Sequence, residues 1–113
     1  RRNEIANNYK KAFKGKVKFQ SLPEGNYNAH HLFIIEVEDR KGLYDFLRTQ
    51  NIFAQIHYIP AHTLPYYKEI GYGSVNLSNS ENYYSKCISL PMYPSLTNEE
   101  QKLVIDKVLS FIQ

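Results

Sequence analysis

The segment from His30 to Val37, which reads HHLFIIEV, constrains the fold of this chain most. In an extended strand, successive side chains point to opposite faces, and here apolar residues fall on both. One face carries His31, Phe33, Ile35 and Val37, and the other carries Leu32 and Ile34. Because a strand with two apolar faces needs cover on both sides, the segment predicts a central strand under packed helices.

The residues before and just after this strand predict two helices and a short strand. Ile5, Tyr9 and Phe13 recur at four-residue spacing, which indicates one apolar stripe on a helix of residues 1–14 that ends at Gly15. Residues 16–19 alternate and predict a short strand. Asp39 is a suitable N-cap for a helix over residues 40–50.

The second half of the chain predicts one more strand and several helices. Residues 52–58 alternate, and Pro60 ends that strand because proline cannot donate to a sheet ladder. Short helices are expected around residues 64–70 and 80–86. Thr97 and Glu100 have the spacing of a capping box ahead of an amphipathic helix that continues through Ile112.

This order of elements predicts an α+β fold in which a short, mainly antiparallel sheet is covered by helices. The 113 residues suffice for one domain with one core. The expected core consists of Phe33, Ile35, Leu43, Phe46, Leu47, Ile56, Val104 and Val108.

Composition excludes several classes of protein. No apolar run approaches the roughly 20 residues that a membrane helix needs, so no membrane partner is expected. The opening residues lack the order of a secretory signal, and the single cysteine, Cys87, fits a reducing compartment, which favours the cytoplasm. The basic residues of the stretch 1–18 lie far in sequence from the tyrosine clusters. We therefore read that stretch as a solvated helix face and expect no nucleic-acid partner.

No self-contained active site is visible. His30 and His31 are adjacent and point to opposite faces of a strand, so they do not share a metal ion. His57 and His62 straddle a proline without a Cys or Asp at a ligand spacing, and no metal is expected. Cys87 is interpreted as a small buried apolar residue, and no phosphate cradle is recognisable.

Tyrosine is in excess, with ten residues and no tryptophan. A phenol has a flat apolar body and a polar tip, which suits the surface of a sugar-binding site and equally suits a contact with another domain. A free-standing carbohydrate- or protein-binding module without catalysis is therefore one alternative for this chain.

Four segments in order carry a resemblance to a known family. They are RRNEIANNY (residues 1–9), HYIPAH (57–62), PYYKEIGY (65–72) and SENYYSKCISLPMYPSLTNEE (80–100). In order and spacing they resemble the small C-terminal domain of the nucleotide-sugar aminotransferases of the DegT/DnrJ/EryC1/StrS family. These are pyridoxal-phosphate enzymes of fold type I. Their C-terminal domains show an H-Y-x-P-x-H stretch and an L-P-[MF]-[YHF]-P-x-[LM]-[ST] run before the last helix.

The resemblance implies that residues 1–113 are this C-terminal domain and that a large domain lies upstream. The first helix has no capping residue ahead of it, which also favours a fragment. In the family the large domain supplies the Schiff-base lysine and an aspartate for the pyridoxal phosphate. We therefore expect this chain to contain no catalytic or cofactor-binding residue and to bind no pyridoxal phosphate alone. The implied reaction moves an amino group from glutamate to the C4 ketone of a UDP-linked 4-keto-6-deoxy sugar in a homodimer.

The resemblance also assigns a role to the stretch around the two histidines. Gln55, Ile56, His57 and Tyr58 are expected to line the sugar-nucleotide site, with His62 as a further candidate contact. The alternative is that His57 and His62 only hydrogen-bond the turn and hold the shape of the loop.

Overall fold

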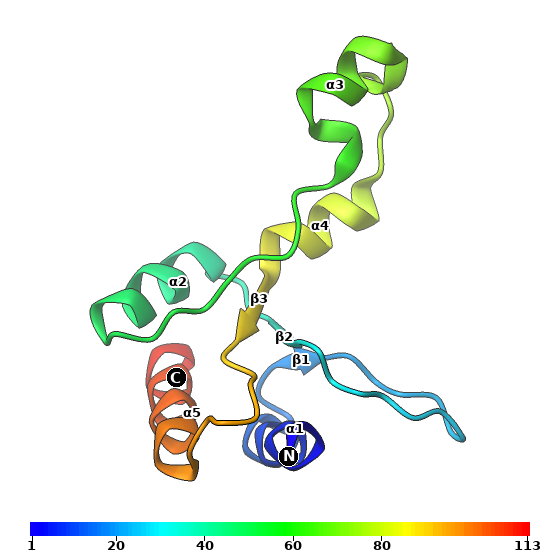
Figure 1. Ribbon diagram of the computed structural model, residues 1–113. Coiled ribbons are helices and arrows are strands. Elements are labelled where there is room, and N and C mark those ends of the chain that lie inside the picture. The colour runs from blue at the N-terminus through cyan, green and yellow to red at the C-terminus, as the bar shows by residue number, and fades with distance from the viewer.

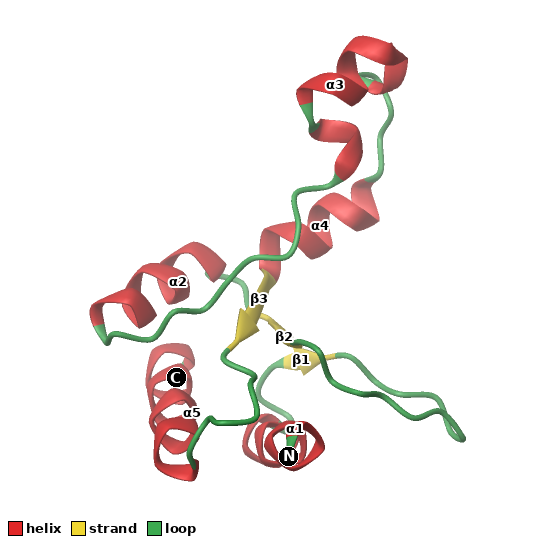
Figure 2. Ribbon diagram, viewed as in Figure 1, coloured by secondary structure: helices red, strands yellow, loops and turns green.

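The computed structural model describes all residues from Arg1 to Gln113. Figure 2 shows the helices and strands of an α+β fold. In chain order the elements are α1 (Arg2–Phe13), β1 (Lys18–Phe19), β2 (Phe33–Glu36), α2 (Arg40–Thr49), η1 (Ala61–Thr63), α3 (Pro65–Tyr67), η2 (Lys68–Tyr72), α4 (Ser78–Lys86), β3 (Cys87–Leu90) and α5 (Asn98–Ile112).

The three strands form one antiparallel sheet in the order β1-β2-β3. Phe19 pairs with Ile35 across β1 and β2, and Phe33 pairs with Leu90 across β2 and β3. The predicted central position of β2 is therefore confirmed, and so is the antiparallel sheet. The strand is shorter than the predicted segment 30–37.

The two faces of the sheet differ. On one face Phe33 and Ile35 lie opposite Leu90 and Ile88, and all four side chains are buried. The ring of Tyr9, from α1, packs on Phe33 with 5.0 Å between centroids. The other face carries Ile34 and Glu36 opposite Ser89 and Cys87, and both β2 residues are only half-buried. The prediction of cover on both sides is thus right for one face of β2 and wrong for the other.

Helices α1, α2 and α5 pack on the covered face and supply about half of the 17 residues of the buried core (Figure 1). Six of the eight predicted core residues are buried: Phe33, Ile35, Leu43, Leu47, Val104 and Val108. Phe46 is partly buried and packs against this core, with its ring 5.5 Å from that of Phe111. Ile56 is also only half-buried, because the chain begins to lead away from the core there.

Two predicted helix starts are confirmed. The Asp39 carboxylate accepts a hydrogen bond from the Gly42 N–H at 2.9 Å and caps α2. Thr97 and Glu100 form the reciprocal capping box at the start of α5. None of the helices combines the length and the apolar character that crossing a membrane requires.

The predicted strand over residues 52–58 is wrong. Ile52 and Ala54 are buried and Phe53 and Gln55 are exposed, so the alternation is real, but only Gln55 makes a bridge, to Ser89. That bridge uses β3, a strand that the sequence reading did not predict. An extended segment can bury alternate side chains against a core without forming a hydrogen-bonded ladder. The helix predicted around residues 64–70 is broken into α3 and η2.

Residues 59–86, here called the arm, project away from the rest of the chain, here called the body (Figure 1). The radius of gyration is 15.7 Å, whereas a compact domain of this length has roughly 13 Å. No residue of the arm is buried. The arm meets the body where Lys86 is followed by β3. This junction lies next to the face of the sheet that carries Ile34 and Glu36, here called the open face.

Candidate functional site

Strand β3 holds the stretch that the sequence analysis assigned to substrate binding. The Gln55 N–H donates to the Ser89 carbonyl at 3.0 Å, and the Ser89 N–H donates to the Gln55 carbonyl at 2.7 Å. The two residues form a closely paired antiparallel bridge, so their side chains lie on the same face. Because side chains two residues apart also share a face, His57 is expected on this side of the segment.

A hydrogen bond with the Ser89 side chain fixes the side chain of His57. The imidazole Nδ1 and the Ser89 Oγ are 2.9 Å apart. The Cys87 Sγ lies 3.8 Å from the carbonyl oxygen of His57 and 3.7 Å from that of Tyr84, so these two acceptors share its single hydrogen. Burial raises the pKa of Cys87, which keeps the thiol protonated and able to donate. Cys87 is thus buried, as predicted, and it also helps to hold the backbone of His57.

The open face of the sheet carries further polar groups near this segment. Glu36 and Tyr83, with three neighbouring side chains, line a hollow of about 320 Å³. Burial, and then the negative charge of Glu36, raise the pKa of Tyr83, so its phenol stays neutral at physiological pH. A neutral phenol both donates and accepts hydrogen bonds. The open face therefore carries a phenol and a carboxylate that line this hollow, and the His57 imidazole outside the hollow.

The structure brings together three of the five predicted site residues. Gln55 and His57 lie on the open face, and Tyr58 follows with 75% of its surface exposed. The rings of His57 and Tyr58 meet edge to face, 4.6 Å between centroids. Ile56 has the opposite orientation along the chain, toward the side that carries Ala54. Its side chain therefore lies on the face opposite to that of His57, and its contact with substrate stays a prediction.

His62 lies in the arm and is bonded within it. Its Nε2 is 2.7 Å from the Glu81 Oε1, and only 9% of the side chain is exposed. This pair joins η1 to α4. The geometry favours the alternative in which His62 holds the shape of the loop, while its contact with substrate stays a prediction.

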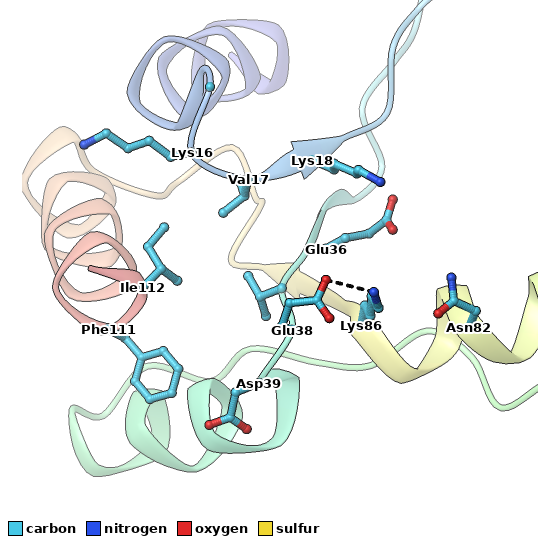
Figure 3. Close-up of a pocket in the computed structure, with 12 residues that line it drawn as sticks. Lys16, Val17, Lys18, Glu36, Glu38, Asp39, Asn82, Lys86, Phe111 and Ile112 are labelled. Atoms are coloured by element: carbon cyan, nitrogen blue, oxygen red, sulfur yellow. Dashed lines mark hydrogen bonds and ion pairs between the residues drawn. The ribbon is translucent and has the colours of Figure 1, made fainter.

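A larger hollow, of about 640 Å³, is likewise lined by none of the five predicted residues (Figure 3). It opens between the α1–β1 turn, the start of α2 and the ends of α4 and α5, and its lining carries both charge signs. The Lys86 ammonium donates to the Glu38 carboxylate at 2.8 Å within it. Because its charges balance one another, this hollow shows no preference for a ligand of one sign.

Sequence reasoning missed Ser89, Cys87, Glu36 and Tyr83 as members of the open face. The signal was present in the run Cys87-Ile88-Ser89-Leu90, in which apolar Ile88 and Leu90 alternate with small residues. Reading that run as a strand would have placed Cys87 and Ser89 together on one face.

Comparison with known proteins decides the family. Residues 1–109 match the DegT/DnrJ/EryC1/StrS aminotransferase family. The chain belongs to this family. The match extends over nearly the whole chain, as the resemblance implied, and it favours the aminotransferase interpretation over a free-standing binding module.

Three DegT/DnrJ/EryC1/StrS relatives illustrate the similarity. The spore coat polysaccharide biosynthesis protein SpsC of Bacillus subtilis is 33% identical over 129 residues, covering 100% of this chain and 32% of that protein. The UDP-4-amino-4,6-dideoxy-N-acetyl-beta-L-altrosamine transaminase of Campylobacter jejuni is 28% identical over 120 residues, covering 100% and 32%. A DegT DnrJ EryC1 StrS aminotransferase from Brucella abortus superposes with a TM-score of 0.86 at 36% identity, covering 97% of this chain and 30% of that structure. The chain thus spans about a third of the length of these relatives.

The residues of this family member do not fit a pyridoxal-phosphate site. No lysine side chain is buried, and Lys86, one of the better covered ones, is paired with Glu38. Every buried side-chain nitrogen and oxygen already has a hydrogen-bond partner, so none is left aimed at a missing group. That the chain alone binds no pyridoxal phosphate stays a prediction.

Proposed function

We propose that this chain is the C-terminal domain, residues 1–113, of a pyridoxal-phosphate-dependent nucleotide-sugar aminotransferase. The family match supports the reaction class, and the names of the SpsC and altrosamine transaminase relatives support a sugar substrate. The cofactor supplies an electron sink when bound. The residues that hold it belong to the large domain upstream, and the enzyme works in the cytoplasm, in keeping with its single cysteine.

Within this class, the donor is glutamate and the acceptor is the C4 ketone of a UDP-linked 4-keto-6-deoxy sugar. The similarity to the altrosamine transaminase supports this finer assignment, and our proposal includes a role in pseudaminic acid biosynthesis. We infer that this chain contacts the acceptor rather than the donor, because the donor amino acid is small and the nucleotide sugar is long.

The role of this chain is to form one wall of the acceptor site. The single observation that carries this role is the fixed imidazole of His57 on the open face of the sheet, with Gln55 and Tyr58 beside it. An amide, an imidazole and a phenol supply donors and acceptors for sugar hydroxyls and phosphate oxygens. Their side chains orient the acceptor and exclude water, and none of them carries the amino group.

A homodimer completes the proposal. The arm exposes nine large apolar side chains: Ile59, Leu64, Tyr66, Tyr67, Ile70, Tyr72, Val75, Leu77 and Tyr83. Contiguous exposed apolar groups with abundant tyrosine are typical of an interface. We infer that this surface packs against the second subunit.

Separate measurement of the two half-reactions tests the acceptor wall in the full-length, cofactor-loaded enzyme. His57→Ala and Tyr58→Phe should lower kcat/KM for the keto-sugar. The loss should correspond to roughly 1–3 kcal/mol of transition-state stabilisation, the range for a lost polar contact. The glutamate half-reaction should stay nearly unchanged, because that small donor needs few contacts from this wall.

Matched controls are His31→Ala and Tyr27→Phe, since both side chains are exposed and lie outside the proposed site. Wild-type rates with the keto-sugar for His57→Ala and Tyr58→Phe would remove both residues from the wall. An equal loss in both half-reactions, with lower thermal stability, would show that the two residues have a structural role.

A further inference from the structure

Ser89 has a buried hydroxyl with one hydrogen-bond partner. The residue is 3% exposed, and its Oγ bonds only to the Nδ1 of His57, at 2.9 Å. The other ring nitrogen of His57, Nε2, has no partner in this chain, and the residue is half-exposed. One nitrogen of the ring is therefore fixed from the sheet and the other is free for a ligand.

The direction of this hydrogen bond follows from what the hydroxyl can do. If Nδ1–H donated to the Ser89 oxygen, the hydroxyl hydrogen would be buried without an acceptor, which is unfavourable. If the hydroxyl donates to Nδ1, both groups are satisfied. In a neutral imidazole, an unprotonated Nδ1 requires that Nε2 carry the hydrogen.

We infer that Ser89 is a positioning residue that holds His57 as its Nε2–H tautomer, so that His57 donates a hydrogen bond to an oxygen atom of the nucleotide-sugar acceptor. This inference rests on the proposed function, because it deepens the role given there to His57. It specifies the ligand atom by its chemistry: a lone-pair oxygen of a sugar hydroxyl, carbonyl or phosphate, and not a donor group.

The same residue also fixes the backbone beneath the ring. Ser89 and Gln55 exchange two backbone hydrogen bonds, at 3.0 and 2.7 Å, two residues before His57. The ring and the chain that carries it thus share one support. A binding group held in this way loses little conformational freedom when its ligand arrives, which favours affinity.

The first test is kinetic and uses the full-length, cofactor-loaded enzyme. Ser89→Ala should lower kcat/KM for the keto-sugar roughly three- to tenfold, mainly through KM, the range for one hydrogen bond. The glutamate half-reaction should not change. Ser89→Thr, which keeps the hydroxyl, should restore most of the loss, and Ser110→Ala, which removes a hydroxyl from the far end of α5, is the matched control.

A double-mutant cycle separates positioning from general stability. If Ser89 acts through His57, Ser89→Ala should have no further effect on the keto-sugar half-reaction once His57→Ala is present. Full additivity would overturn the inference. If His57→Ala weakens this half-reaction and Ser89→Ala leaves it unchanged, the acceptor wall survives and only the role of Ser89 fails. If neither variant has an effect, both proposals fail.

Substitutions of His57 test the tautomer without any change at Ser89, so the inference stays testable if Ser89→Ala fails to fold. His57→Gln places an amide N–H near the position of Nε2, whereas His57→Asn places it near Nδ1. Gln should retain several-fold more keto-sugar activity than Asn, and equal activity would overturn the inference. Nitrogen NMR of ¹⁵N-histidine-labelled enzyme near pH 8 should show an unprotonated Nδ1 for His57, and a protonated Nδ1 would also overturn it.

Discussion

The body and the arm of this chain are held together by different means. All 17 residues of the main hydrophobic cluster lie in the body, on α1, α2, α5, the sheet and the segments next to them. The arm has no buried residue, although it makes up about a quarter of the chain and carries nine of the 15 exposed large apolar side chains. The apolar side chains of the body therefore form an internal core, whereas those of the arm are exposed to solvent.

This difference separates two functions. A domain can position a ligand-binding segment through contacts with buried residues. Here the buried residues Ser89 and Cys87 contact His57. An interface instead keeps apolar groups exposed until a second surface covers them. The candidate site lies where the two regions meet, between residues 55–58 of the body and the start of the arm. Motion of the arm relative to the body would therefore act directly on the site.

The largest expected effect contrasts two isoleucines, one in each region. Ile35→Ala should lower the free energy of unfolding of this chain by about 2–5 kcal/mol, because Ile35 is fully buried in the core. Ile70→Ala, the same change at a site that is 52% exposed in the arm, should stay within about 0.5 kcal/mol of wild type. Urea unfolding of both variants measures the difference. Similar losses would mean that the arm has a core of its own.

The second effect concerns the proposed dimer of the full-length enzyme. Tyr66→Ala removes a ring that is 64% exposed in the arm and should raise the dimer dissociation constant about tenfold or more, since buried tyrosines often dominate interfaces. Tyr27→Ala is the matched control, because Tyr27 is 83% exposed in the body. Sedimentation velocity over a concentration series measures both. Equal dissociation constants for the two variants would place the interface elsewhere.

A smaller effect is expected from the internal bond of the arm. His62→Ala removes the 2.7 Å pair with Glu81, and the arm has few other side-chain bonds that join η1 to α4. Amide hydrogen exchange over residues 59–77 should accelerate roughly two- to tenfold, while the midpoint of global unfolding stays unchanged. Lys41→Ala, which breaks the exposed Lys41–Asp45 pair of the body, is the control. A fall in the global midpoint would show that arm and body unfold together.

The body was predictable from sequence because local signals and burial agree there. The two-sided apolar strand, the Asp39 cap and the Thr97–Glu100 box each point to the element that forms. The alternation of residues 52–58 was misleading, because alternate burial against a core and pairing in a ladder give the same sequence period. Strand β3 was missed because it has only four residues, all buried, directly after a helix.

Only part of the candidate site was predictable, because one of its members lies in the strand that was not predicted. The stretch around His57 was found through the family motif, but its partner Ser89 lies 32 residues away in the unpredicted strand. In the arm, the helix predicted around residues 80–86 is confirmed as α4, whereas the helix predicted around residues 64–70 is broken. Gly71 adopts a positive φ of 105° there and interrupts the helical path.

The smallest expected effect tests a capped helix of the body against the uncapped α4 of the arm. The Thr97 backbone N–H and hydroxyl donate to the Glu100 carboxylate at 2.8 and 3.0 Å and lower the pKa of Glu100 from its ordinary value of 4.5. A carboxyl group whose folded pKa is depressed contributes stability above its unfolded pKa and loses it as the pH falls through the folded pKa.

Glu100→Gln keeps the acceptor oxygen but not the charge, so it should unfold at a slightly lower temperature than wild type above about pH 5. The difference should shrink as the pH falls through the lowered pKa of Glu100 in the folded state, because below that pKa both side chains are neutral. In a His62→Ala background, which removes the partner of Glu81, Glu81→Gln at the start of the uncapped α4 should show no such pH dependence. Thermal unfolding at several pH values decides, and a difference that grows toward low pH would contradict the assigned direction of the pKa shift.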